Sequence, residues 1–92
     1  MKQYRLNGWQ MGTKEKAHRH LKKRLRLPDY YGNNIDALCD CLCEIGEPVQ
    51  ITLTHANWMR AHLGEYGTRL ISAMLACTGE NPRVHVCIRE KW

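Results

Sequence analysis

The spacing of apolar and polar residues predicts three short β-strands. Residues 2–7 alternate polar and apolar side chains, and the turn-forming pair Asn7-Gly8 ends this run. Residues 49–53 are rich in β-branched side chains, which favours a buried strand at the centre of a sheet. Residues 84–88 predict a third strand.

Four other segments have the three-to-four-residue apolar spacing of helices. The first is expected to begin at an N-cap residue, Thr13, and to end before Leu27-Pro28, because a residue that precedes proline disfavours helical conformation. The other three are predicted at about 34–45, 55–63 and 68–77, with glycines at 46, 64 and 79 beyond their ends.

The order strand, helix, helix, strand, helix, helix, strand favours parallel strands joined by right-handed crossovers. We therefore expect an α/β fold, a three-stranded parallel β-sheet with about four packed α-helices. The 92 residues are enough for one modest core, and we expect a single domain over residues 1–92.

The predicted helix at 34–45 has an apolar side and an acidic side. At about 100° per residue, Leu38, Leu42 and Ile45 fall together and form the core side. The opposite side is expected to face solvent and carries Asp36, Cys39, Asp40 and Cys43.

The two acids of this helix are not equivalent. Asp36 lies in the first turn, where the helix dipole stabilises an anion by about 0.3–1 kcal/mol. Asp40 lies one turn further on and repels Asp36 by about 0.2–0.5 kcal/mol. A local cost without a folding benefit points to function, although exposed acids are more commonly only solvated surface.

The turn before this helix is built from residues that restrict the backbone. Pro28 fixes its own φ, and Gly32 is expected to adopt a positive φ. Asn34 is expected to cap the helix through its side chain. Of Tyr30 and Tyr31, we expect one to pack inward and the other to point outward. Such a turn holds its side chains in fixed positions, which lowers the entropic cost of binding.

Charge is segregated along the chain. The net charge is +5, yet residues 27–80 hold seven acids and only two basic residues, whereas residues 1–26 hold nine Lys or Arg and one Glu. The five cysteines lack a disulfide-scaffold spacing and fit a reducing compartment, so we expect a cytoplasmic protein. Neither a membrane span nor an export signal is predicted.

One stretch carries a long and specific pattern. Within residues 18–42, Leu27-Pro28, Tyr30-Tyr31-Gly32, Asn34, Asp36-Ala37-Leu38 and Asp40-Cys41-Leu42 occur in fixed register. This stretch resembles the barstar family of intracellular ribonuclease inhibitors. The resemblance implies three parallel strands with four helices, in agreement with the periodicity, and it implies a ribonuclease or nuclease toxin as partner.

The resemblance also implies roles for individual residues. Asp40 would occupy the phosphate site of the nuclease, Asp36 would pair with a second basic group, and Tyr30 would pack near the catalytic histidine. The implied partner-binding residues are Tyr30, Gly32, Asn34, Ile35, Asp36, Cys39, Asp40 and Cys43.

This chain departs from the family pattern in three respects. Cys39 stands where the family has an aromatic residue, and Cys77 is the nearest match to an acid that the family contributes from its last helix. The chain is also basic overall, which would weaken long-range steering toward a basic enzyme.

Three alternatives compete with an inhibitor. The basic helix that begins at Thr13 could follow nucleic-acid phosphates, but we disfavour this because no aromatic stacking platform accompanies it. Asp36, Cys39, Asp40 and Cys43 could bind zinc, but no second ligand cluster is evident. An enzyme is the least favoured class, because exposed carboxylates on a convex helix lack a pocket. We therefore expect an inhibitor that acts as a monomer without a cofactor, metal or membrane.

Overall fold

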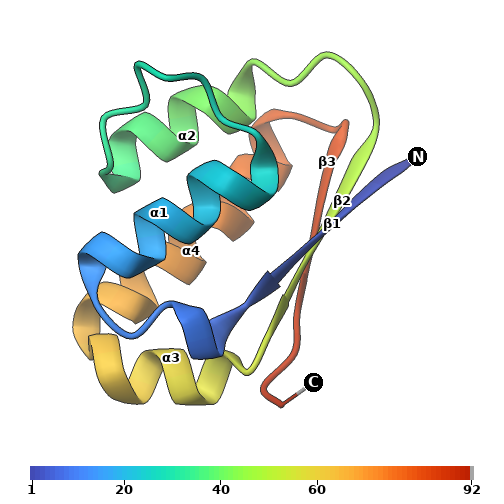
Figure 1. Cartoon of the computed structure of the whole chain (residues 1–92). Coiled ribbons are helices and arrows are strands. Elements are labelled where there is room, and N and C mark those ends of the chain that lie inside the picture. Colours follow the sequence, from blue (N-terminus) through green and yellow to red (C-terminus); the bar gives the residue numbers. More distant parts are fainter. Residues whose placement is uncertain (92) are drawn as a thin grey trace.

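The computed structural model describes residues 1–91, which form a three-stranded parallel sheet and four α-helices (Figure 1). Strands β1 (Lys2–Asn7), β2 (Val49–Thr54) and β3 (Val84–Ile88) lie side by side in the order β1-β2-β3. Leu6 of β1 is opposite Leu53 of β2, and both strand pairs are parallel. The predicted α/β fold class and the central position of the second strand are confirmed.

The helices connect the strands in pairs. Helices α1 (Lys14–Leu25) and α2 (Ile35–Cys43) lie between β1 and β2, and helices α3 (Ala56–Leu63) and α4 (Glu65–Glu80) lie between β2 and β3. A 3-10 turn that the sequence did not predict, η1 (Gly8–Gln10), joins β1 to the loop before α1.

All four helices cover the same side of the sheet (Figure 1). The core lies between this helical layer and the sheet, and its fully buried members come from every layer: Leu6, Leu21, Leu38, Leu42, Ile51, Leu53, Met59, Leu70 and Met74. The alternate strand positions are more polar and more accessible, as with Gln3, Arg5 and His85. A two-layer arrangement of this kind follows from strands with one apolar and one polar face.

The predicted bounds of two helices are wrong. Helix α2 ends at Cys43 rather than near residue 45, and helix α4 runs over residues 65–80 rather than 68–77. Gly79 therefore lies inside α4, where its exposed position tolerates a glycine. The helix ends instead where the amide of Asn81 donates to the carbonyl of Cys77 at 2.8 Å and Pro82 follows.

No helix within residues 1–91 combines the length and the apolar composition needed to cross a bilayer.

Candidate functional site on helix α2

Helix α2 begins at a well-formed cap. The side-chain oxygen of Asn34 accepts a hydrogen bond from the amide of Ala37 at 2.7 Å, as the sequence predicted. The side-chain amide of Asn34 donates to the carbonyl of Gly32 at 3.2 Å, which ties the cap to the preceding turn. The first turn of α2 and the loop before it therefore form one hydrogen-bonded unit.

The two tyrosines of the turn point in opposite directions, as expected. Tyr31 is 5% exposed and belongs to the core, whereas Tyr30 is 79% exposed. The expectation of a positive φ at Gly32 is wrong, because the left-handed residue is Asn33 with φ of 55°. Asparagine tolerates this conformation well. Glycine suits position 32 for a steric reason instead. A Cβ atom there would lie only 3.2 Å from the side-chain nitrogen of Asn34.

A buried histidine holds Tyr31 in place. His18 of α1 is 2% exposed, and its Nδ1 atom is 2.6 Å from the hydroxyl of Tyr31. Its Nε2 atom is 2.5 Å from the hydroxyl of Tyr66 in α4. Burial lowers the pKa of His18, and burial raises the pKa of Tyr31. All three groups are therefore neutral near pH 7, and they join α1, the turn and α4.

The carboxylates of α2 are exposed and unpaired. Asp36 and Asp40 both face solvent. The ion pairs found within residues 1–91 join Lys2 to Glu47, Lys22 to Asp29 and Arg60 to Glu90, and none of them includes Asp36 or Asp40. These two charges are available to groups outside the chain.

Other predicted site residues differ in exposure. Gly32, Asn34 and Cys43 are exposed, and Ile35 is half-buried against the core. Cys39 was expected to face solvent, but it is half-buried and packs against the core. Its small side chain fills the edge of the contact between α2 and the rest of the protein instead of projecting outward.

Helix α4 supplies a carboxylate that the sequence interpretation missed. Cys77, the nearest match to the family's acid, is buried, and burial together with the thiol of Cys39 raises its pKa to about 12. Glu80 lies one turn further along the same helix, is exposed, and accepts a hydrogen bond from the thiol of Cys43 at 3.4 Å. This bond raises the pKa of Cys43. Glu80 lies three residues after Cys77, and residues at this spacing are neighbours on a helix surface. This spacing could have identified Glu80 from the sequence.

Exposed acids of α2 and α4 thus gather on one surface. We use the term acidic surface for Asp36 and Asp40 of α2, the C-cap residue Glu44 and Glu80 of α4.

The end of α2 is fixed by another buried side chain that the sequence did not reveal. Asn81 is 5% exposed, and its side-chain amide donates to the carbonyls of Leu42 at 2.9 Å and Ile45 at 3.0 Å. Its side-chain oxygen accepts from the amide of Arg83 at 3.1 Å. Because α2 is held at both ends, the acidic surface is preorganised.

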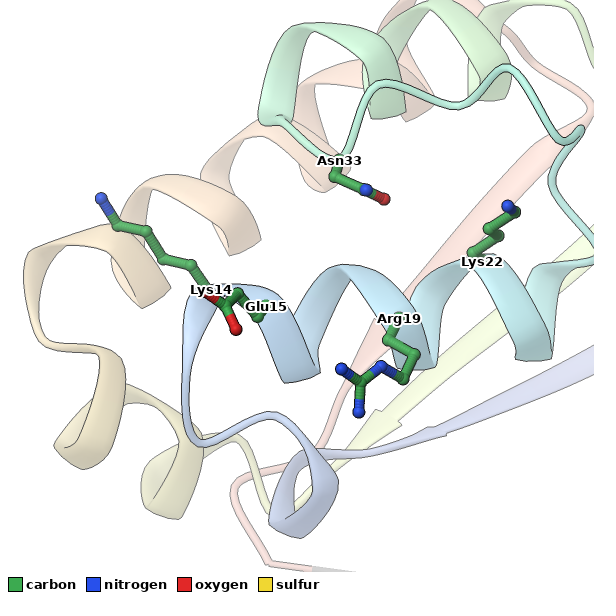
Figure 2. A pocket seen from close by; sticks show the side chains of 5 residues that line it. All are labelled: Lys14, Glu15, Arg19, Lys22 and Asn33. Carbon is green, nitrogen blue, oxygen red and sulfur yellow. The ribbon is translucent and has the colours of Figure 1, made fainter.

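A basic hollow adjoins the turn before α2 (Figure 2). It is lined by Lys14, Glu15, Arg19, Lys22 and Asn33, so cations of α1 lie beside the loop that leads to the acidic surface. Within residues 1–91, no group of three or more His, Cys, Asp or Glu side chains is placed to hold a metal ion. The structure therefore adds no support to the zinc alternative.

Comparisons with known proteins agree with this architecture. The family described as barstar, the barnase inhibitor, matches residues 1–88. This chain belongs to the barstar family. It is also 32% identical over 75 residues to "Putative ribonuclease inhibitor YrdF" of Bacillus subtilis (strain 168), an alignment that covers 80% of this chain and 82% of that protein. The family resemblance read from residues 18–42 is therefore confirmed over nearly the whole chain.

Proposed function

We propose that this protein binds a ribonuclease and blocks its active site with the acidic surface and the turn before α2. The observation that carries the proposal is the pair of exposed, unpaired carboxylates on a helix held at both ends. Membership of a family of ribonuclease inhibitors supports it. Action would be stoichiometric and not enzymatic, because occlusion needs no turnover.

The carboxylates would act as phosphate mimics. A ribonuclease binds the phosphates of its substrate with Arg, Lys and His, and a carboxylate offers the same charge and two acceptor oxygens to such groups. Asp40 lies midway along α2, so we propose that it enters the phosphate site and that Asp36 pairs with a second basic group nearer the turn. Tyr30, Gly32, Asn34 and Ile35 would line the contact beside them.

The differences from the family pattern change how the contact would be made. Cys39 cannot supply the large aromatic surface expected at that position, and interface energy commonly depends on such residues. Cys43 and Glu80, which are hydrogen-bonded to each other, would form the opposite border of the contact. We propose that Glu80 supplies the last-helix acid in place of Cys77.

The cellular role follows from this mechanism. We propose a monomeric, cytoplasmic immunity factor that protects its own cell from a nuclease toxin. The expectation of a cytoplasmic location comes from the five cysteines, whose spacing is not that of a disulfide scaffold.

The test is a paired capture followed by a ribonuclease assay. Immobilised wild type, Asp40→Ala, Asp36→Ala and the control Glu65→Gln would be exposed to lysate of the source organism at moderate salt. Bound proteins would be identified by mass spectrometry, and each variant would be titrated into the captured nuclease. Glu65 is an exposed acid at the start of α4, outside the acidic surface.

We expect Asp40→Ala to lower the affinity by roughly 30-fold or more relative to the wild type, because hot-spot truncations cost about 2 kcal/mol or above, and Asp36→Ala to lower it less. Glu65→Gln should inhibit like the wild type. If Asp40→Ala and Asp36→Ala both inhibited as well as the wild type, the acidic surface would not be the interface.

A further inference from the structure

An exposed tryptophan lies on the other side of α1 from α2. Trp9 belongs to η1 and is 58% exposed. In Figure 1, η1 and α3 lie at one end of the helical layer and α2 lies at the other, with α1 between them. The indole ring of Trp9 stacks on the ring of His55, with centroids 3.8 Å apart and planes inclined by 16°. One flat face of the indole is thus covered, and most of the remaining surface is in solvent.

The position of Trp9 is set by the backbone around it. Gly8 approaches the start of α3 so closely that a Cβ would lie 2.4 Å from the carbonyl oxygen of His55. The side chain of Asn7 accepts from the amide of Trp9 at 3.0 Å, and the amide of Asn7 donates to the imidazole of His20 at 2.9 Å. Trp9 is therefore a preorganised aromatic platform rather than a loose surface side chain.

Cations line one side of this platform. Trp9 borders a shallow hollow with Gln10 and His20, and the charged groups around the hollow are Lys16, Arg19 and Lys23 of α1. None of these three cations is ion-paired within residues 1–91. The premise that no aromatic side chain accompanies the basic helix is wrong, because the turn of η1 brings Trp9 beside it.

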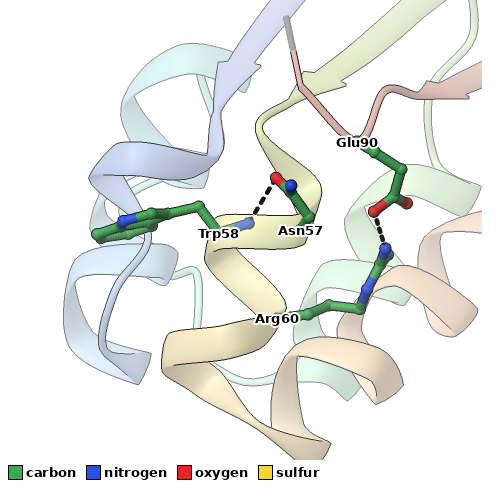
Figure 3. Close-up of polar contacts among 4 residues, drawn as sticks. All are labelled: Asn57, Trp58, Arg60 and Glu90. Carbon is green, nitrogen blue, oxygen red and sulfur yellow. Dashed lines mark hydrogen bonds and ion pairs between the residues drawn. The ribbon is translucent and has the colours of Figure 1, made fainter.

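A second, apolar hollow lies on the His55 side of the platform. It is lined by Trp9, His55, Asn57, Trp58, Ala61 and Lys91. Trp58 stacks on His62 with ring centroids 3.7 Å apart, so a second stacked ring pair borders this hollow. Figure 3 shows the indole of Trp58 extending from α3 toward η1. The backbone amide of Trp58 donates to the side-chain oxygen of Asn57 at 2.8 Å.

We propose that Trp9, Lys16, Arg19 and Lys23 form a binding site for single-stranded nucleic acid, for which RNA is the probe. A base would stack on the indole face opposite His55, and the adjoining phosphates would contact the three cations. Flat aromatic platforms beside a basic groove are how proteins bind single strands without sequence preference. An acidic protein would use the cations, but a nucleic acid supplies a flat base and an adjoining phosphate in every repeating unit, so nucleic acid is the favoured partner.

This inference does not depend on the proposed inhibition. The acidic surface is on α2 and α4, whereas the nucleic-acid site is on η1 and α1, and no residue belongs to both. Each set of residues can therefore be removed without the other.

The test is fluorescence anisotropy with a labelled 12-nucleotide single-stranded RNA of mixed sequence, from 50 to 200 mM salt. Trp9→Ala should weaken binding by roughly 5- to 150-fold, since stacking one base contributes about 1–3 kcal/mol. Arg19→Gln should lower the slope of log affinity against log salt by about 0.7. Arg83→Gln, a charge-matched change outside the site, should leave the affinity within twofold.

Three results would overturn the proposal. One is an absence of RNA binding by the wild type at 50 mM salt. Another is an equal RNA affinity of Trp9→Ala and the wild type, when thermal melts show that both are folded. That result would mean that RNA is held by diffuse charge attraction only. The third is equal affinity for a poly-glutamate of matched charge, which would identify an acidic protein as the partner.

Discussion

Two buried histidines of α1 should make the stability of this protein fall steeply below pH 6.5. His18 is 2% exposed and His20 is 8% exposed. Burial lowers the pKa of His18, and burial, Arg24 and Lys23 lower the pKa of His20. Both imidazoles are neutral in the folded chain near pH 7, whereas in the unfolded chain they titrate near pH 6.5.

The sign and size of the effect follow from proton linkage. As pH falls through 6.5, the unfolded chain binds protons that the folded chain does not, so the free energy of unfolding decreases. Each such proton gives a slope of at most about 1.4 kcal/mol per pH unit. Two histidines would together remove at most roughly 2.5 kcal/mol between pH 7 and pH 5.5. This is a large share of the 5–15 kcal/mol that is typical of a folded protein.

Protonation of His18 would also reach the candidate site. A neutral imidazole can accept from one tyrosine hydroxyl and donate to the other, but a charged imidazole can only donate. Protonated His18 would have to donate to both tyrosine hydroxyls, which reverses the bond that it accepted, and its buried charge would disfavour the packed arrangement of these three side chains. Because Tyr31 belongs to the turn before α2, partner affinity should decrease over the same pH range.

Urea unfolding at pH 7.5, 6.5 and 5.5 would measure the slope for the wild type, His18→Gln and the control His85→Gln. His18→Gln should be less stable at pH 7.5 but should show about half the pH slope. His85 is exposed on β3, so its replacement should leave the slope unchanged. A wild-type slope that persisted in His18→Gln would refute the argument that this imidazole stays neutral in the fold.

Three further predictions concern the contact between α2 and α4. Asn81→Ala should lower the free energy of unfolding by roughly 1–3 kcal/mol, because buried α2 carbonyls and the amide of Arg83 lose a partner; a thermal melt would measure it. In the native protein at pH 8, iodoacetamide should modify Cys43 and spare Cys77, since Cys77 is buried with its pKa raised to about 12. Glu80→Gln should speed the reaction of Cys43, because the bond to Glu80 raises the pKa of that thiol; peptide mass spectrometry would show an unchanged rate if the bond is absent.

Local patterns predicted the elements well because they depend on neighbours in the sequence. The Thr13 cap, for example, accepts from the amide of Lys16 at 3.1 Å, as its spacing predicted. The end of α4 was misjudged because Gly79 was taken as a stop signal, although an exposed glycine only weakens a helix. The actual stop depends on Asn81, whose role is visible only once the chain is folded.

Long-range contacts were beyond the reach of sequence patterns. His18 meets Tyr66 across 48 positions, and the Asn81 side chain meets the carbonyl of Leu42 across 39. Nothing in the spacing of these residues marks them as partners. The same limit applies to Trp9, since its place beside α1 depends on the unpredicted turn η1.

The charge segregation seen in the sequence takes a definite spatial form, and it constrains the partner. Cations of α1 line the hollow beside Asn33, next to the turn that leads into the acidic surface. A nuclease seated on Asp36 and Asp40 would bring its rim toward these cations, and charges that approach within the Debye length of about 8 Å interact at physiological ionic strength. A uniformly basic rim would be repelled there. The proposed partner should therefore have a basic active site for the acidic surface and a neutral or acidic rim opposite α1, and this arrangement would select against other basic ribonucleases.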